Sequence, residues 1–155
     1  MPAILFVCTG NTCRSPMAEV IFKDQLSQHG LEAAAWCIES AGTWAPDGSP
    51  AARFGREVMA KRGLDLSRHR ARTVTREMLQ QFDLILVMET NHKEALCAEF
   101  RDLCKKIYLL SEMVALKISV EDPIAGTVTD YQATAKEIED YITRGWQRIL
   151  ELTQA

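Results

Sequence analysis

Two kinds of hydrophobic pattern follow one another along the chain. Nearly continuous apolar runs at 3–8 and 82–88 are typical of strands that are buried on both faces of a sheet. Shorter apolar stretches at 34–39 and 106–110 indicate two more strands. The pattern therefore predicts four short strands, separated by segments of a different periodicity.

Apolar residues recur at helical spacing in the segments between these strands. Gly30 and Gly63 each follow such a segment, at the position where helices commonly end. Loops are expected at 40–50, which is rich in Gly, Pro and Asp, and at 111–130. The predicted helices cover residues 17–29, 51–62, 75–81, 92–104 and 131–152.

Strands that alternate with helices predict an α/β fold. We expect a small four-stranded parallel sheet with helices on both faces. The chain has 155 residues, which suits one domain over 1–155. Ligands of such sheets bind beyond the carboxyl ends of the strands. The segment that follows the strand at 3–8 is therefore the first place to search for chemistry.

Composition and charge narrow the classes of function. The net charge of −3 at pH 7 gives no reason to expect nucleic acid or a membrane surface as a partner. No apolar run approaches the length of a membrane span, and the N-terminus lacks the features of a secretory signal. Five cysteines cannot all pair, so we expect reduced thiols and a cytoplasmic protein. The oligomeric state is left open.

The segment after the first strand combines a thiol with an anion-binding loop. Pro16 suits the first turn of a helix, so the segment predicts a tight turn that points backbone N–H groups at one spot. Cys8 can act as a nucleophile there, and Arg14 can hold a phosphate with two parallel hydrogen bonds. The sequence of the segment is Cys8-Thr9-Gly10-Asn11-Thr12-Cys13-Arg14-Ser15-Pro16.

Each polar residue of this segment has a possible role in cleaving a phosphate ester. The helix N-terminus and Arg14 favour the thiolate form of Cys8. Gly10 is expected to allow torsions that a side chain would forbid, and Asn11 tolerates a left-handed backbone. Ser15 can donate a hydrogen bond to the sulfur. The phosphate is expected to lie against the residues from Thr9 to Ser15.

Two other interpretations of the segment fail on the sequence. No Gly-Lys-Ser/Thr follows Gly10, which excludes a nucleotide-binding P-loop. Cys8 and Cys13 lack a second Cys/His pair at zinc-ligand spacing, so we expect no metal.

The same segment resembles the signature of the low-molecular-weight protein-tyrosine phosphatases. The resemblance also includes residues 40–43, 69–72 and 122–123, and so extends over nearly the whole chain. It implies that Cys8 is the nucleophile, Arg14 the phosphate clamp and Asp122 the general acid and base, with Glu121 as a less suitable neighbour. It also implies a phosphorylated protein as substrate, inorganic phosphate as product and no cofactor.

The resemblance assigns further roles around the loop. Asn11, Ser40 and His69 are similar to a network that holds the anion loop open. Cys13 corresponds to a thiol that can form a reversible disulfide with the nucleophile. A buried small side chain is an equally good interpretation of Cys13. His29 and His92 have no counterpart in the pattern, and we interpret them as surface groups at helix ends.

Several positions around the loop bear on which phosphorylated residue is the substrate. Trp44 resembles a wall that stacks on a phenyl ring, which favours phosphotyrosine. Ile124 and Ala125 stand where tyrosine-specific members carry aromatic residues. Thr12 is shared with the protein-arginine phosphatases of the family. Phosphotyrosine is therefore the first expectation and phosphoarginine the alternative.

Two classes other than a phosphatase remain as alternatives. Arsenate reductases share the fold and use a second pair of cysteines. Cys97 and Cys104 are two helical turns apart and are expected on a core stripe with Phe100, and Glu89-Thr90-Asn91 occupies the position where such a pair begins. A phosphate-binding module without catalysis would need neither Asp122 nor an ionised Cys8.

Overall fold

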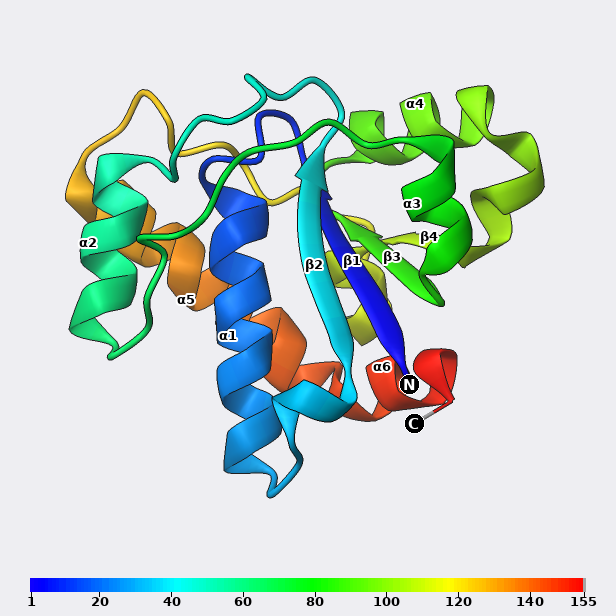
Figure 1. The fold of residues 1–155 in the computed structure, drawn as a ribbon, viewed down its shortest axis with the longest axis horizontal. Helices are drawn as coiled ribbons and strands as arrows, with labels where there is room; N and C mark the ends of the chain where they lie inside the picture. The colour runs from blue at the N-terminus through cyan, green and yellow to red at the C-terminus, as the bar shows by residue number, and fades with distance from the viewer. Residues whose placement is uncertain (155) are drawn as a thin grey trace.

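The computed structural model describes residues 1–154, and at its centre lies a sheet of four parallel strands (Figure 1). The order β2-β1-β3-β4 puts the first strand in the interior of the sheet. The predicted α/β architecture is confirmed. The strands are β1 (Ala3–Cys8), β2 (Cys37–Gly42), β3 (Leu84–Val87) and β4 (Ile107–Leu109).

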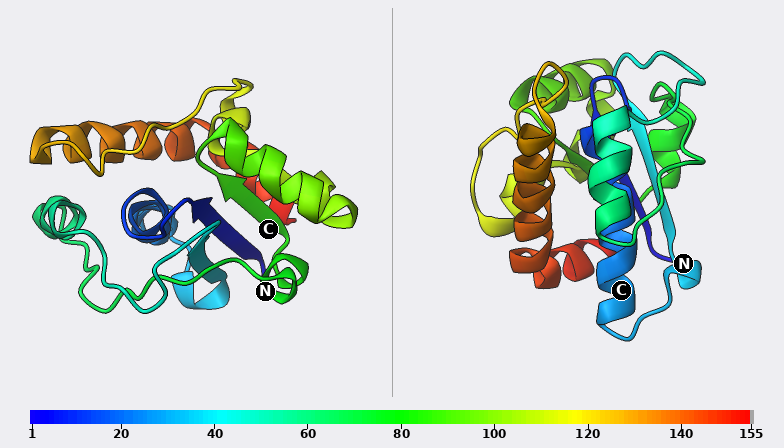
Figure 2. Two further views of the ribbon diagram at one scale, coloured as in Figure 1. Left: turned by 90° about the horizontal axis from the view of Figure 1, so that it is seen from above. Right: turned by 90° about the vertical axis from the view of Figure 1, so that its left-hand side faces the viewer.

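Helices cover both faces of the sheet. Helices α1, α2, α5 and α6 pack on one face, and α3 and α4 pack on the other (Figure 2). None of the helices within residues 1–154 is long and apolar enough to cross a membrane. The α-helices are α1 (Arg14–Gln28), α2 (Arg53–Lys61), α3 (Arg76–Gln81), α4 (Thr90–Glu99), α5 (Val128–Arg144) and α6 (Trp146–Thr153). The 3₁₀ helices are η1 (Ala33–Ala35), η2 (Arg101–Lys106) and η3 (Leu110–Val114).

Burial on both faces explains the apolar sequence of β1. Ile4 and Phe6 point into the core beneath α1 and α5, whereas Leu5 and Val7 point into the core beneath α3 and α4. All four side chains are fully buried. Alternate side chains of a strand face opposite sides of the sheet, so β1 can be neighboured by helices on both sides only if it is apolar throughout.

The second strand and the first helix differ from their predicted bounds. The strand predicted at 34–39 lies three residues later, at Cys37–Gly42, because Ser40, Ala41 and Gly42 pair with the end of β1. Small residues have little intrinsic preference for strands, so local pattern could not reveal this pairing. The helix predicted at 17–29 begins earlier, at Arg14, which places the predicted phosphate clamp in its first turn.

The last predicted helix is two helices with a break at Gly145. A Cβ atom at this position would overlap Met113 and the carbonyl oxygen of Tyr141. The chain therefore needs a glycine where the end of α5 crosses η3. Ile138, Tyr141, Ile142 and Ile149 form an apolar stripe at helical spacing and are buried, and Leu152 on the same stripe is half-buried.

The structure corrects two expectations about Cys97 and Cys104, one on their redox state and one on their spacing. Cys97 and Cys104 form a disulfide, so the thiols are not all reduced; Cys8, Cys13 and Cys37 are free. The predicted helix ends at Glu99, and Cys104 lies in η2, so the two cysteines are not two turns apart on one helical stripe. The chain turns between them, which brings the two sulfur atoms together.

Removing this disulfide is expected to destabilise the fold moderately. Closing a loop of this short length restricts the unfolded chain by roughly 2 kcal/mol. The double variant Cys97→Ser/Cys104→Ser should therefore unfold at lower urea concentration than the oxidised wild type and should not respond to reductant. Alkylation of the denatured, unreduced wild type should label the three free cysteines. Labelling of all five would contradict the disulfide.

Candidate active site

The loop between β1 and α1 lies at the carboxyl edge of the sheet, where the sequence predicted a site (Figure 1). Asn11 takes the left-handed conformation, with φ of 54°, as its residue type suggested. Helix α1 begins at Arg14 with Pro16 in its first turn. The N–H groups of that turn have no partner within the helix, which makes this end of α1 suited to an anion.

The glycine that the loop requires is not the predicted one. Gly10 does not take a positive φ, and a Cβ atom there would make only ordinary contacts. Gly42, at the end of β2, is the constrained position, because a Cβ atom there would overlap the carbonyl oxygen of Thr9 and crowd the N–H of Asn11. The end of β2 thus supports the anion loop from beside it.

The sulfur of Cys8 lies among hydrogen-bond donors. The Oγ atom of Ser15 is 3.0 Å from Cys8 Sγ, and the backbone N–H of Asn11 donates to the sulfur at 3.3 Å. The Cys8 side chain is only 2% exposed. Donors directed at a sulfur stabilise a thiolate, and they also stabilise it as a leaving group.

Asn11 connects the loop to the rest of the protein. Its Nδ2 atom donates to Ser15 Oγ at 2.9 Å and to Ser40 Oγ at 3.0 Å. Its carbonyl accepts from Nε2 of His69 at 2.6 Å, and its Oδ1 accepts from the backbone N–H of Arg72 at 3.0 Å. The structure therefore brings together the three residues that the resemblance placed in a network. Because Asn11 is fully buried, these contacts fix the shape of the loop.

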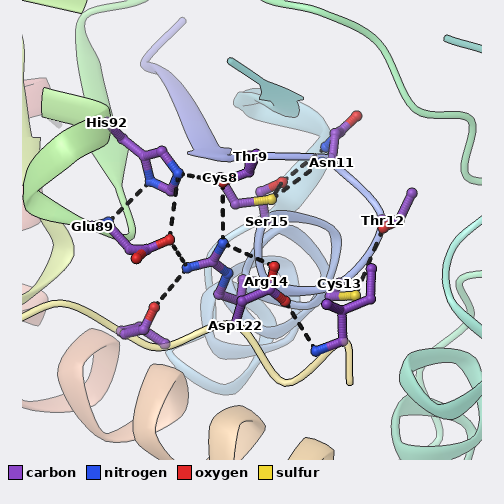
Figure 3. Close-up of polar contacts among 12 residues, drawn as sticks. Cys8, Thr9, Asn11, Thr12, Cys13, Arg14, Ser15, Glu89, His92 and Asp122 are labelled. Atoms are coloured by element: carbon purple, nitrogen blue, oxygen red, sulfur yellow. Dashed lines mark hydrogen bonds and ion pairs between the residues drawn. The ribbon is translucent and has the colours of Figure 1, made fainter. Parts of the chain in front are cut away.

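Arg14 is held along one side of its guanidinium group. Nη1 donates to Oε2 of Glu89 at 2.6 Å (Figure 3). It also donates to the carbonyl of Val120 at 2.7 Å. Among residues 1–154, Nε of Arg14 is the one buried polar side-chain atom that has no hydrogen-bond partner. The edge formed by Nε and Nη2 is the one that matches two oxygens of a phosphate.

Asp122 belongs to the loop before α5, and its side chain lies beside Arg14 at the anion loop. Its Oδ2 atom is 3.4 Å from Nη2 of Arg14, and its side chain is 36% exposed (Figure 3). Oδ1 accepts from the N–H of Ile124 at 3.1 Å, which fixes the carboxyl group across Pro123. A carboxyl group at the edge of an anion site can reach both a leaving group and water.

The loop and Asp122 line a cleft of about 230 Å³. Thr12 contributes to its lining, together with the predicted walls Trp44 and Ile124 and with Pro46. Trp44 is 80% exposed, so it stands at the mouth of the cleft rather than packing on the core. The cleft has apolar walls and a polar, anion-binding floor.

Cys13 is buried beside the nucleophile loop. Its Sγ atom is 3.3 Å from the hydroxyl of Tyr131, and its side chain is 3% exposed. Burial raises the pKa of the Cys13 thiol. Cys13 therefore stays protonated at neutral pH. No three His, Cys, Asp or Glu side chains in the described part of the chain are grouped so that they could hold a metal ion.

The sequence interpretation missed Glu89 and misassigned His92. His92 is not a surface group: it is 2% exposed, and its Nε2 atom is 2.7 Å from Thr9 Oγ1. Its Nδ1 atom accepts the backbone N–H of Glu89 at 3.0 Å. The position of Glu89 two residues after the end of β3 was the available signal, since β1 and β3 are neighbours with the same direction. His29 is exposed at the end of α1, as predicted.

Protonation of His92 is expected to make the fold sensitive to acid. Burial, assisted by the charge of Arg14, lowers the pKa of His92 from 6.5 to about 4. As the pH falls below 6.5 the unfolded chain binds a proton that the folded protein does not, so stability decreases, by about 3 kcal/mol once the pH has passed the folded pKa. Urea unfolding between pH 7 and 4 should show a weaker pH dependence for His92→Asn than for the wild type. Parallel curves would contradict the burial of a neutral His92.

Comparison with known proteins identifies the family. The family model described as low molecular weight phosphotyrosine protein phosphatase matches residues 3–154. The chain belongs to this family, whose members are hydrolases acting on phosphoproteins. The protein-arginine-phosphatase of Bacillus subtilis (strain 168) is 34% identical over 140 residues, which cover 90% of this chain and 91% of the relative.

Solved structures lead to the same family. A low molecular weight protein tyrosine phosphatase from T. tengcongensis is 40% identical and superposes with a TM-score of 0.88 over 96% of this chain and 99% of that one. A cysteine-to-serine mutant of an arginine phosphatase, described as having a phosphorylated active-site serine, is 33% identical with a TM-score of 0.88. That similarity covers 96% of this chain and 95% of the other.

Proposed function

We propose that the protein hydrolyses phosphorylated residues of proteins through a covalent cysteinyl-phosphate. The Cys8 thiolate attacks phosphorus while the bond to the leaving oxygen breaks, and Asp122 gives that oxygen a proton. The Nε–Nη2 edge of Arg14 and the loop N–H groups bind the other phosphoryl oxygens as they gain charge. The products of this step are the free hydroxyl side chain and the S-phosphorylated enzyme.

The second step returns the enzyme to its starting state. Water attacks phosphorus, and the Asp122 carboxylate accepts its proton. The S–P bond breaks, inorganic phosphate forms, and the sulfur leaves as a thiolate that accepts a hydrogen bond from Ser15. One carboxyl group therefore serves as acid and then as base, without a metal ion or cofactor.

The observation that carries this proposal is the convergence of three groups on one cleft. The sulfur of Cys8, the unpartnered Nε of Arg14 and the carboxyl of Asp122 come from β1, α1 and the loop before α5. A buried donor without a partner is costly, and a phosphoryl oxygen would satisfy it. The similar arginine phosphatase with a phosphorylated active-site serine supports direct phosphoryl transfer to the nucleophile position.

We propose phosphotyrosine as the substrate residue. The cleft offers Trp44, Pro46 and Ile124 as apolar walls above the anion loop. A phenyl ring can stack on such walls while its phosphate reaches the floor. The short stem of phosphoserine would leave its phosphorus above Cys8.

Thr12 makes phosphoarginine the second candidate. Its side chain lines the cleft and replaces the aliphatic residue common in tyrosine-directed members. A small polar residue leaves room for a guanidinium group, and relatives named as protein-arginine phosphatases are about as similar to this chain as those named as tyrosine phosphatases.

A parallel assay on phosphotyrosine and phosphoarginine peptides distinguishes these substrates. We expect faster hydrolysis of phosphotyrosine by the wild type. Thr12→Ile should shift the ratio of kcat/KM values further towards phosphotyrosine by about tenfold, because it fills the space available to a guanidinium. A wild type that prefers phosphoarginine would establish the second candidate, and a ratio unchanged by Thr12→Ile would exclude that residue as the selectivity determinant.

Two further parts of the proposal concern redox chemistry and location. We propose that a peroxide can oxidise the Cys8 thiolate to a sulfenic acid, and that the Cys13 thiol then displaces its hydroxyl group as water. The resulting Cys8–Cys13 disulfide would protect the nucleophile from irreversible oxidation. We also propose a cytoplasmic enzyme.

Arsenate reduction is not favoured as the activity. Glu89 occupies the position after β3 where a shuttle pair of cysteines would begin, and it forms an ion pair with Arg14.

A further inference from the structure

The neighbourhood of His92 fixes which of its nitrogens carries the proton. A backbone N–H can only donate, and the N–H of Glu89 points at Nδ1 of His92 at 3.0 Å. Nδ1 is therefore an acceptor without a hydrogen. The ring is buried and its pKa is lowered to about 4, so it is neutral at pH 7 with its single proton on Nε2.

This tautomer determines the direction of the Thr9 hydroxyl. Nε2 of His92 donates to Thr9 Oγ1 at 2.7 Å, and Nη2 of Arg14 approaches the same oxygen at 3.5 Å (Figure 3). A hydroxyl group has two lone pairs and one hydrogen. Because both neighbours are donors, the hydrogen of Thr9 must point elsewhere.

The cleft is the direction that remains. Thr9 lines it beside Cys8, Arg14 and Asp122. Among residues 1–154, Thr9 Oγ1 has hydrogen-bond contacts only with His92 and Arg14, so no protein acceptor receives its hydrogen. The Thr9 hydroxyl and Nε of Arg14 are therefore both donors at the anion-binding cleft that have no acceptor in the protein.

We propose that the Thr9 hydroxyl donates a hydrogen bond to a phosphoryl oxygen, and that His92 is the positioning residue that orients it. This inference rests on the proposed phosphatase function and adds a side-chain donor to the backbone N–H groups and Arg14. Thr9 contacts the substrate directly, whereas His92 acts only through Thr9. The donor requires no movement of the loop, because the contact with His92 already holds it in place.

The first test compares Thr9→Val, which removes the hydroxyl at nearly constant volume, with Thr9→Ser, which keeps it. With 4-nitrophenyl phosphate, Thr9→Val should lower kcat/KM by about tenfold or more and weaken inhibition by inorganic phosphate by a similar factor. Thr9→Ser should recover most of both. Thr9→Ala serves in place of Thr9→Val if valine prevents folding. Activity of the valine and alanine variants within twofold of the wild type would overturn the proposal.

The second test separates positioning from a structural role of His92. His92→Asn keeps an acceptor for the N–H of Glu89 and removes the donor to Thr9. It should lower kcat/KM in the wild type but cause little further loss in the Thr9→Val background. Equal losses in both backgrounds would mean that His92 acts through the structure of α4 instead.

Nitrogen NMR of the ring provides a readout that needs no substrate. We expect ¹⁵N shifts of a protonated Nε2 and an unprotonated Nδ1 at pH 7. The opposite tautomer would overturn the proposal while leaving the phosphatase function intact. Conversely, a wild type that does not hydrolyse 4-nitrophenyl phosphate would refute the proposed function, and with it the role of Thr9 in hydrolysis, even if the NMR spectrum shows the expected tautomer.

Discussion

Replacing Cys8 by serine is expected to reduce turnover by roughly 10⁴-fold or more. A serine hydroxyl remains protonated in a site that stabilises a thiolate, so it is a poor nucleophile towards phosphorus. The anion loop, Arg14 and the network around Asn11 do not depend on the sulfur. Inhibitor-binding measurements on Cys8→Ser should therefore show that inorganic phosphate and vanadate still bind.

The matched control is Cys37→Ser, which changes a free, half-buried thiol on β2 outside the cleft. This variant should hydrolyse 4-nitrophenyl phosphate at the rate of the wild type. Substantial activity of Cys8→Ser, with phosphate binding intact, would refute covalent catalysis by Cys8. Loss of both activity and binding would show that the variant has disturbed the loop, and Cys8→Ala would then repeat the test.

Asp122→Asn is expected to give the second largest effect, and its size should depend on the leaving group. General acid catalysis typically contributes 10²-fold to 10⁴-fold. We expect a loss of about this size for phenyl phosphate, whose leaving oxygen needs a proton. For 4-nitrophenyl phosphate, whose leaving group is stable as an anion, the loss in the first step should be much smaller. The measurement is kcat/KM across a series of aryl phosphates.

Glu121→Gln is the control for this series, because it removes the neighbouring carboxylate, which is exposed. It should leave the dependence of kcat/KM on leaving-group pKa unchanged. A uniform loss across the series for Asp122→Asn would argue against an acid role for Asp122. A steeper dependence for Glu121→Gln would assign that role to Glu121 instead.

The local sequence was sufficient to predict the elements on which the site is built. The apolar runs of β1 and β3 are continuous because both strands are buried on two faces, and this is a local property. The anion loop was recognisable since Cys8, Arg14 and Pro16 stand at fixed offsets within one turn. Asn11 was expected to tolerate a left-handed conformation on residue type alone, and the structure shows that it adopts one.

Contacts across long sequence distances could not be predicted in the same way. Glu89 and Arg14 are 75 positions apart, and Thr9 and His92 are 83 apart. The residues around Glu89 do not indicate its ion pair with the buried Arg14; the pair follows from β3 lying beside β1. His92 was interpreted as a surface group because it has no counterpart in the family pattern. Its hydrogen bonds to Glu89 and Thr9 make its burial possible.

The Cys97–Cys104 disulfide was missed for a related reason. A helix drawn straight from 92 to 104 separates the two sulfur atoms by two turns, and only the end of α4 at Glu99 brings them together. Helix ends are among the least certain features of a sequence pattern. The same limitation hid the break at Gly145, which depends on contact with Met113.

The anion loop is held from both sides before any substrate binds. On one side Asn11 is bonded to Ser40, His69 and the backbone of Arg72. On the other side Arg14 is anchored by Glu89 and the carbonyl of Val120. The groups that would meet a phosphate therefore need little reorganisation, which is the main source of electrostatic catalysis in such sites.

A crystal structure with vanadate tests the role of this loop most directly. We predict a vanadium atom bonded to Cys8 Sγ, with oxygens facing Nε and Nη2 of Arg14 and the loop N–H groups, and with Asp122 on the side opposite the sulfur. Vanadate bound elsewhere, or a loop without it at saturating concentration, would contradict the central claim that this turn binds a phosphoryl group in line with the sulfur.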